Sequence, residues 1–286
     1  MLGRRGALRL LALPPYVWLA GFFVLPLLLI VAISLRPEAG PIDFDDPWLL
    51  TLDQYQRIIE TPAYLRRLGI SVVMALVVAG TATVLAYPIA YFLAFRARSR
   101  ATLFLILLLV PYAVSYLLRI MAWRLMLGQE GAINSLLQWT GMIAEPLDLL
   151  FYSQAAVVIT LVYVWIPFAA LPIYAALQRI ERAHLEAAAD LGAGPWNRFW
   201  RVTVPLSLPG AVAAFFMVFI PTVGEYVTPS LVGGTEGYMY GNLIRDFFSQ
   251  AASWTTGSAL SVIMLLLTLA LVLLALRLID VRRLVS

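Results

Sequence analysis

The sequence predicts an all-α integral membrane protein with about six transmembrane helices. Hydrophobic residues make up 62% of the 286 residues and charged residues only 13%, whereas soluble domains are close to half apolar and a quarter charged. The apolar residues gather in six runs, each near the ~20 residues that cross the core of a bilayer. The segments between the runs are alternately rich in arginine and in acidic residues. A lipid-embedded bundle explains all three observations.

The six runs define the expected spans. They cover residues 14–35, 69–95, 101–123, 153–177, 208–230 and 257–279. The first follows three arginines, as a signal peptide would, but it is too long for the apolar part of one. We therefore expect a retained first helix. The longest outer segment, 37–67, is expected to hold a short amphipathic helix around residues 52–59.

The charges predict the orientation of the chain. The basic side carries Arg4, Arg5, Arg9, Arg96, Arg98, Arg100, Arg179, Arg182, Arg198, Arg201, Arg277, Arg282 and Arg283. The acidic side carries Glu38, Asp43, Asp45, Asp46, Asp53, Glu60, Glu130, Glu145 and Asp148. Because basic loops stay in the cytoplasm, both termini are expected there. This arrangement requires an even number of spans.

Missing residue types restrict the chemistry. The chain has no cysteine, which excludes thiol catalysis and Cys-based metal sites, and His184 is its single histidine. It has no lysine, so it lacks the Gly-Lys-Ser/Thr of a phosphate-binding loop and should not hydrolyse ATP itself. We expect no cofactor, no metal and no enzymatic activity. The net charge of +4 is spread beside the spans, which favours membrane orientation over nucleic-acid binding.

The loop 179–209 has a pattern of its own. Residues 179–191 are rich in Ala, Leu, Glu and Arg, which favour a helix. Gly192 can adopt the left-handed conformation that ends a helix. Pro195 suits the first position of a second helix, which we expect to stop at Pro205. The loop is therefore predicted to be a cytoplasmic helix-turn-helix.

The spacing of Glu186-Ala187-Ala188, Gly192 and Pro205 resembles the EAA loop of permease subunits of type I binding-protein-dependent ABC importers. Valine replaces the family's Ile and Leu before Pro205, which leaves the register intact. The resemblance implies a type I ABC importer transmembrane domain over 66–277, after an N-terminal helix and outer loop at 1–65 and before a cytoplasmic tail at 278–286. The alternative is a helix lying in the lipid interface, without a protein partner.

The family resemblance also implies partners and a location. Such a permease pairs with a second permease subunit, two copies of an ATP-binding subunit and an external substrate-binding protein. The five residues of the EAA pattern would form the ATPase-coupling site. The chain would be a multi-pass protein of the bacterial cytoplasmic (inner) membrane, surrounded by lipid.

Several stretches resemble the spermidine/putrescine branch of this family more than other branches. They are residues 123–128, 131–134, 171–174, 205–210 and 219–229 with Gly233-Gly234. The resemblance implies import of polyamines. Permeases for opines, related amines and other small organic solutes share much of the pattern, so such a solute is the alternative.

Glu225 is the candidate substrate-path residue. An ionised carboxylate in or near the fifth span is costly unless it faces a cavity or a partner. Aromatic faces and a carboxylate together suit a cationic amine, and the aromatic candidates are Tyr226, Tyr112, Tyr116, Tyr163 and Trp165. Alternatively, Glu225 lies among the outer headgroups, paired with Arg119 or Arg245. Arg119 would repel polyamines from the path, so we assign it a structural role.

Two other protein classes explain less of the sequence. A secondary transporter needs ionisable groups within its spans, and apart from Glu225 these are scarce. A membrane enzyme needs a catalytic constellation, for which a chain with no cysteine and one histidine has little material. Neither class accounts for the loop 179–209.

Overall fold

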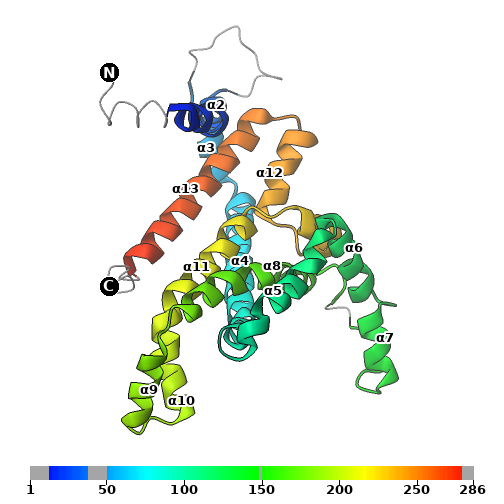
Figure 1. The fold of residues 1–286 in the computed structure, drawn as a ribbon. Helices are drawn as coiled ribbons and strands as arrows, with labels where there is room; N and C mark the ends of the chain where they lie inside the picture. The colour runs from blue at the N-terminus through cyan, green and yellow to red at the C-terminus, as the bar shows by residue number, and fades with distance from the viewer. Residues whose placement is uncertain (1–12, 38–49, 148–149, 279–286) are drawn as a thin grey trace, which may run out of the picture. The chain divides into compact units, whose positions relative to one another are not determined.

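The structure, a computed structural model, describes residues 13–37, 50–147 and 150–278, and every regular element in them is helical. The helices long and apolar enough to cross a membrane are Leu13–Ser34, Pro62–Ala97, Gln154–Gln178, Pro195–Val223 and Trp254–Arg277. The bent pair Ala101–Ala113 and Tyr116–Trp139 adds a sixth span if it is counted as one. The predicted fold class is therefore confirmed (Figure 1).

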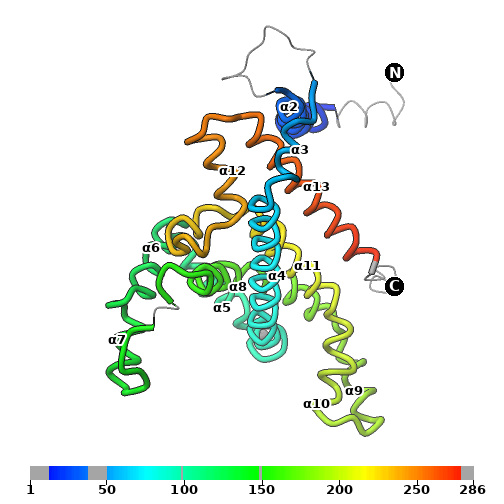
Figure 2. Tube along the Cα trace, turned by 180° about the vertical axis from the view of Figure 1, so that it is seen from behind, coloured from blue at the N-terminus to red at the C-terminus, as the bar shows by residue number. Residues whose placement is uncertain are grey.

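The elements follow one another in this order (Figures 1 and 2): η1 (Ala20–Val24), α2 (Leu25–Ser34), α3 (Asp53–Glu60), α4 (Pro62–Tyr91), η2 (Phe92–Ala97), η3 (Arg98–Arg100), α5 (Ala101–Leu109), η4 (Val110–Ala113), α6 (Tyr116–Leu127), α7 (Ala132–Trp139), α8 (Gln154–Gln178), α9 (Arg182–Asp190), α10 (Pro195–Arg198), η6 (Phe199–Thr203), α11 (Val204–Val223), η7 (Pro229–Gly233), α12 (Tyr240–Ser249) and α13 (Trp254–Leu278). The η elements are π-helical except η3 and η4, which are 3-10 helices.

The chain folds as two compact units, and residues 1–65 with 243–267 form the first. Helix α3 is the short amphipathic helix expected around residues 52–59, which is confirmed. Its buried face carries Gln54, whose side-chain carbonyl accepts a hydrogen bond from Thr256 Oγ1 at 2.9 Å. The Tyr55 hydroxyl lies 2.6 Å from Ser34 Oγ. Because a buried amide without a partner is costly, the bond between Gln54 and Thr256 fixes how α3 meets α13.

Residues 66–242 and 268–286 form the second unit, and the packing of α8 against α11 is its most extensive helix pair. Gly210 makes this close packing possible. A Cβ there would lie 2.6 Å from the Pro172 carbonyl oxygen and would also collide with the Ala176 side chain. Small residues let membrane helices approach closely, which is how they gain packing energy without a hydrophobic driving force. Helix α4 joins the unit through a row of buried alanines.

The third predicted span, 101–123, is wrong as a single helix. The first arm ends at Ala113, the second begins at Tyr116, and the two arms meet at 85°. Pro111 lies in the 3-10 turn that ends the first arm, and Val114 and Ser115 between the arms are extended, with ψ of 144° and 138°. Proline cannot donate the bond that would continue a regular helix. Both arms are apolar, which is why hydrophobicity alone did not reveal the break.

The loop 179–209 differs from its prediction at both ends. Its first helix begins at Arg182, because Glu181 is extended (ψ 139°). Its second helix does not stop at Pro205 but runs from Pro195 to Val223 as one span. In a regular α-helix Pro205 would collide with the carbonyl of residue 201. The π-helical turn η6 lies just before it and widens the helix there.

Candidate functional site

Helices α9 and α10 form a hairpin between α8 and α11, at one end of these two spans (Figure 1). No residue of α9 or α10 is buried. At the turn Leu191 is 89% exposed, and Trp196 on α10 is 71% exposed. Large apolar side chains exposed together on a small element mark a surface that another molecule covers.

Gly192 shapes the turn of this hairpin. Its φ is +82°, in the left-handed region that glycine adopts without steric cost. The Gly192 amide donates to the Ala189 carbonyl (2.8 Å), and the Ala193 amide donates to the Ala188 carbonyl (3.0 Å). This pair of bonds is the Schellman motif, which satisfies the last carbonyls of a helix. The predicted helix end at Gly192 is confirmed.

The EAA residues lie on both sides of this turn. Glu186 and Ala187 are exposed and Ala188 is partly buried, all on α9. Pro205 lies in the first turn of α11 and is also exposed. The three α9 residues thus present a small, low-relief surface with one carboxylate. Their role in ATPase coupling stays a prediction.

Tyr112 braces the bend in the third span. Its hydroxyl lies 2.9 Å from the Tyr163 carbonyl and 2.7 Å from the Val164 carbonyl of α8, and it donates to them. Pro167 has no N–H, so the Tyr163 carbonyl four residues earlier lacks its helical partner. In a membrane a freed carbonyl must be satisfied by a neighbouring group. Tyr112 supplies that group.

Glu225 lies just beyond α11, which ends at Val223 and not at residue 230 as the sequence predicted. Its Oε1 accepts hydrogen bonds from the amides of Val227 (2.8 Å) and Thr228 (3.1 Å). Its Oε2 accepts from the Tyr116 hydroxyl at 3.0 Å. A carboxylate is stabilised at a helix N-terminus because it satisfies free amides and faces the positive end of the helix dipole. Glu225 therefore has a structural role whatever else it does.

The other predicted path residues do not all contact Glu225 and Tyr116. Tyr226 is 45% exposed. The Trp165 ring packs against Phe168, which packs against Tyr112. Tyr163 contributes its carbonyl to Tyr112, while its ring packs against Trp123. Tyr116 thus contacts Glu225 directly. Tyr112 and Trp165 are linked to each other through the Phe168 ring.

Arg119 is the residue whose position sequence reasoning missed. Its guanidinium carbon lies 4.2 Å from the centre of the Tyr112 ring and 5.8 Å from that of Tyr116. Within the described part of the chain, its Nε and Nη1 are buried and have no hydrogen-bond partner. The aromatic faces expected to attract a cationic solute thus already hold a cation of the protein. The available signal was the three-residue spacing of Tyr116 and Arg119 within one helix, whereas Tyr112 lies across the break and its contact with Arg119 had no such signal.

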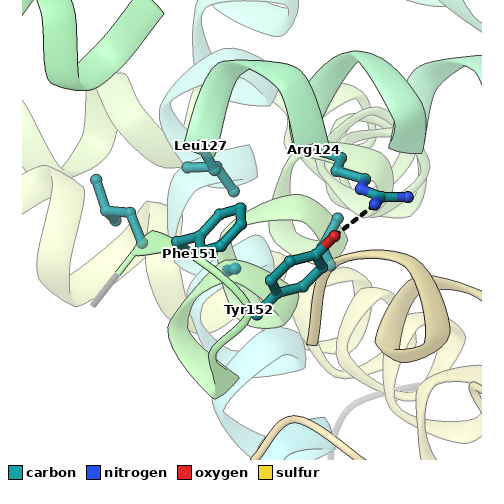
Figure 3. A pocket seen from close by; sticks show the side chains of 7 residues that line it. Arg124, Leu127, Phe151 and Tyr152 are labelled. Atoms are coloured by element: carbon teal, nitrogen blue, oxygen red, sulfur yellow. Dashed lines mark hydrogen bonds between the residues drawn. The ribbon is translucent and has the colours of Figure 1, made fainter. Parts of the chain in front are cut away.

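A small pocket lies between α6 and the segment that precedes α8 (Figure 3). Arg124 donates a hydrogen bond to the Tyr152 hydroxyl, and its guanidinium lies 5.4 Å from the centre of that ring. Leu127 and Phe151 line the same pocket, whose volume is about 10 Å³. Such a space holds one water at most. This contact therefore braces the loop and is not a solute site.

Known proteins resemble the chain closely. Residues 82–285 match the family described as binding-protein-dependent transport system inner membrane component. The chain is 36% identical over 247 residues to the spermidine/putrescine transport system permease protein PotB of Escherichia coli (strain K12), covering 86% of this chain and 88% of that protein. It is 35% identical over 153 residues to the molybdenum transport system permease protein ModB of Azotobacter vinelandii, covering 51% and 63%.

A solved structure agrees with the fold. It is the crystal structure of a bacterial ABC transporter involved in the import of the acidic polysaccharide alginate, with a TM-score of 0.69 and 17% identity. The match covers 97% of this chain and 96% of that one. At this level of identity the match shows the fold alone, and a shared fold does not identify a solute.

Proposed function

The chain belongs to the family of binding-protein-dependent transport system inner membrane components, as a multi-pass permease of an ABC importer, and on this premise we propose that it carries polyamines into the cytoplasm. The observation that carries this proposal is the similarity to PotB, which extends over 86% of the chain. The similarity to ModB, at nearly the same identity, covers only 51%. Spermidine and putrescine are therefore the first solutes to test.

The proposed complex contains a second permease subunit, two copies of an ATP-binding subunit and an external substrate-binding protein. The family and the absence of a phosphate-binding lysine both favour a separate ATPase. Its proposed docking element is α9, where Glu186 and Ala187 are exposed and no residue is buried. An exposed alanine surface allows close approach, and the carboxylate can pair with an arginine of the partner.

The orientation follows from the same element. If α9 docks on an ATPase, the hairpin lies on the cytoplasmic side. Arg179, Arg182, Arg198 and Arg201 lie in or beside it, as the positive-inside rule requires. An even number of spans then places both termini in the cytoplasm. The proposed partition into residues 1–65, 66–277 and 278–286 completes this topology.

In the proposed solute path, Glu225 attracts the amine. Its carboxylate is held by two amides and the Tyr116 hydroxyl, so it is fixed in place. Tyr226, the next residue, is exposed and can offer its ring to the same cation. Tyr112 and Tyr116 contribute less, because Arg119 already lies against their rings.

Arg119 favours a second candidate solute, an opine or a related compound that carries both an amine and a carboxylate. Two of its nitrogen atoms are buried without partners in the described structure. Buried donors of a charged group normally have acceptors, and a solute carboxylate would be one. Such a solute would use Glu225 for its amine and Arg119 for its carboxylate.

Uptake separates these proposals. Labelled putrescine, spermidine and an opine are offered to cells that lack their own importers for them and express this chain with its partner subunits. Polyamine uptake that requires this chain supports the proposal. Opine uptake without polyamine uptake favours the second candidate. Uptake of neither, with the complex assembled and its ATPase active, refutes both solutes and leaves the family assignment intact.

Two charge variants test the two sites separately. Glu186→Lys should abolish uptake and ATPase association together, while membrane insertion survives. Glu181→Lys is the matched control, because Glu181 is exposed at the start of the same helix but outside the EAA pattern. Glu225→Gln should reduce uptake while ATPase association is retained. If Glu186→Lys transports normally, α9 is not the docking element.

A further inference from the structure

An apolar groove of about 490 Å³ lies between α4 and the continuous helix formed by η6 and α11. Both walls belong to the same compact unit. Helix α4 contributes Val84 and Pro88, and α11 contributes Val204 and Leu208. Val84 is 69% exposed and Leu208 is 42% exposed. The groove has the volume of an ordinary ligand pocket but an almost wholly apolar lining.

Aromatic residues gather at the end of the groove nearest the hairpin. Phe199 packs edge-on against Tyr87 (5.8 Å between ring centres) and Tyr91 (5.7 Å) across the two walls. Trp200 packs against Phe199 at 5.2 Å and is 52% exposed. The Tyr87 hydroxyl lies 2.7 Å from Ser207 Oγ, so α4 and α11 are joined beside the groove. Aromatic collars of this kind occur at the level of lipid headgroups.

Two arginines belong to the same turn of helix as Phe199 and Trp200. Arg201 is exposed. Arg198 is partly buried, and its Nε is buried without a hydrogen-bond partner among the described residues. A buried guanidinium nitrogen calls for an acceptor, and phosphate oxygens are acceptors that arginine binds well. No charged residue of the described part of the chain lines the groove itself, and these two arginines flank Phe199 and Trp200 in the sequence at its aromatic end.

From this arrangement we propose that the groove is a binding site for an anionic phospholipid. One acyl chain lies in the groove, and the phosphate group lies at Arg198 and Arg201. Charge complementarity favours a lipid over a protein helix as the occupant. An anionic lipid requires an apolar surface for its acyl chain and positive charge near its headgroup, and the groove with the two flanking arginines offers both. The inference does not depend on which solute is transported.

Native mass spectrometry of the purified importer tests the site. The delipidated complex is titrated with phosphatidylglycerol and with phosphatidylcholine of the same acyl chains. We expect the anionic lipid to be retained preferentially. The double variant Arg198→Gln/Arg201→Gln should weaken phosphatidylglycerol binding by about fivefold for each arginine removed. It should weaken phosphatidylcholine binding less, because the choline cation already offsets the charge of that phosphate. Arg277→Gln, at the end of another span, is the control. Equal retention by the double variant and the unmodified complex would overturn the proposal.

Filling the groove gives a second test. Ala211→Trp places an indole among the lining residues and should remove the bound lipid of either class. Because the chain has no cysteine, Val84→Cys can also carry a single nitroxide, with cysteine-free partner subunits. In nanodiscs of phosphatidylglycerol the label should remain accessible to oxygen, and inaccessible to a water-soluble nickel complex, after the importer assembles. If assembly with the second permease subunit removes oxygen access, a protein segment fills the groove and the lipid proposal is wrong.

Discussion

Replacing Gly192 with alanine changes the backbone of the hairpin and little else. The φ of Gly192 is +82°, and nothing lies within 4 Å of an added Cβ. Side-chain collision therefore plays no part in the effect. An L-residue in this left-handed conformation costs about 1–2 kcal/mol. The cost falls on the turn whose two Schellman bonds end α9.

The expected effect on ATPase binding follows from this cost. A penalty of 1–2 kcal/mol lowers the ratio of the native hairpin conformation to its alternatives by about 5- to 30-fold. If the ATPase binds only the native conformation, its apparent Kd rises in inverse proportion to the native fraction. If the native hairpin is only marginally favoured over its alternatives, most of the 5- to 30-fold change appears as a higher apparent Kd. A very stable hairpin would show less of it.

The assay is the binding of the isolated ATP-binding subunit to the membrane subunits in nanodiscs, with amide hydrogen exchange at residues 187–194 measured in parallel. Gly194→Ala is the matched control, because Gly194 has equally open surroundings but a φ of −64°. Gly192→Asn should fall between the two, since asparagine tolerates the left-handed region. Equal Kd values and equal exchange for Gly192→Ala and Gly194→Ala would refute the reasoning.

Three further substitutions test packing and the aromatic cluster. Gly210→Ala should lower stability by about 1–3 kcal/mol, because the added Cβ collides with α8. Gly80→Ala, with nothing within 4 Å, should not lower it, and thermal unfolding in detergent compares the two. Tyr112→Phe should cost about 1–3 kcal/mol in the same assay, because the Tyr163 carbonyl loses its donor. Glu225→Gln keeps an acceptor for the capping amides but loses the charge. Uptake should therefore fall by about tenfold while the folded yield is retained. Unchanged uptake would show that Glu225 is not part of the solute path.

The hairpin could be predicted from sequence because its determinants are local. Gly192 requires a left-handed residue, and Pro195 fixes the φ of the first position of the next helix. Neither depends on residues far along the chain. Pro205 misled the prediction because its effect depends on the turn before it, and the widened turn η6 has no clear signal in the sequence.

The candidate solute site could be predicted only as a set of residue types. The sequence indicated that Glu225 and several aromatic residues lie at comparable depths. It did not indicate that the fifth helix ends at Val223, which makes Glu225 the cap of the next turn. Nor did it indicate that Arg119 lies against Tyr112. The contact of Arg119 with Tyr112 depends on the geometry of the break in the third span, and apolarity carries no information on that geometry.

The unbroken helix from Pro195 to Val223 has a mechanical consequence. A helix of 29 residues is about 43 Å long. It forms one wall of the apolar groove and ends next to Glu225. A tilt of about ten degrees about one end of such a rod moves the other end by about 7 Å. The π-helical turn η6 lies close to the hairpin end of this helix, and π-helical turns are places where helices bend. A substitution that changes the bend at η6 would therefore change how far the end next to Glu225 moves when the hairpin moves. It would do so without altering a residue at either end of the helix.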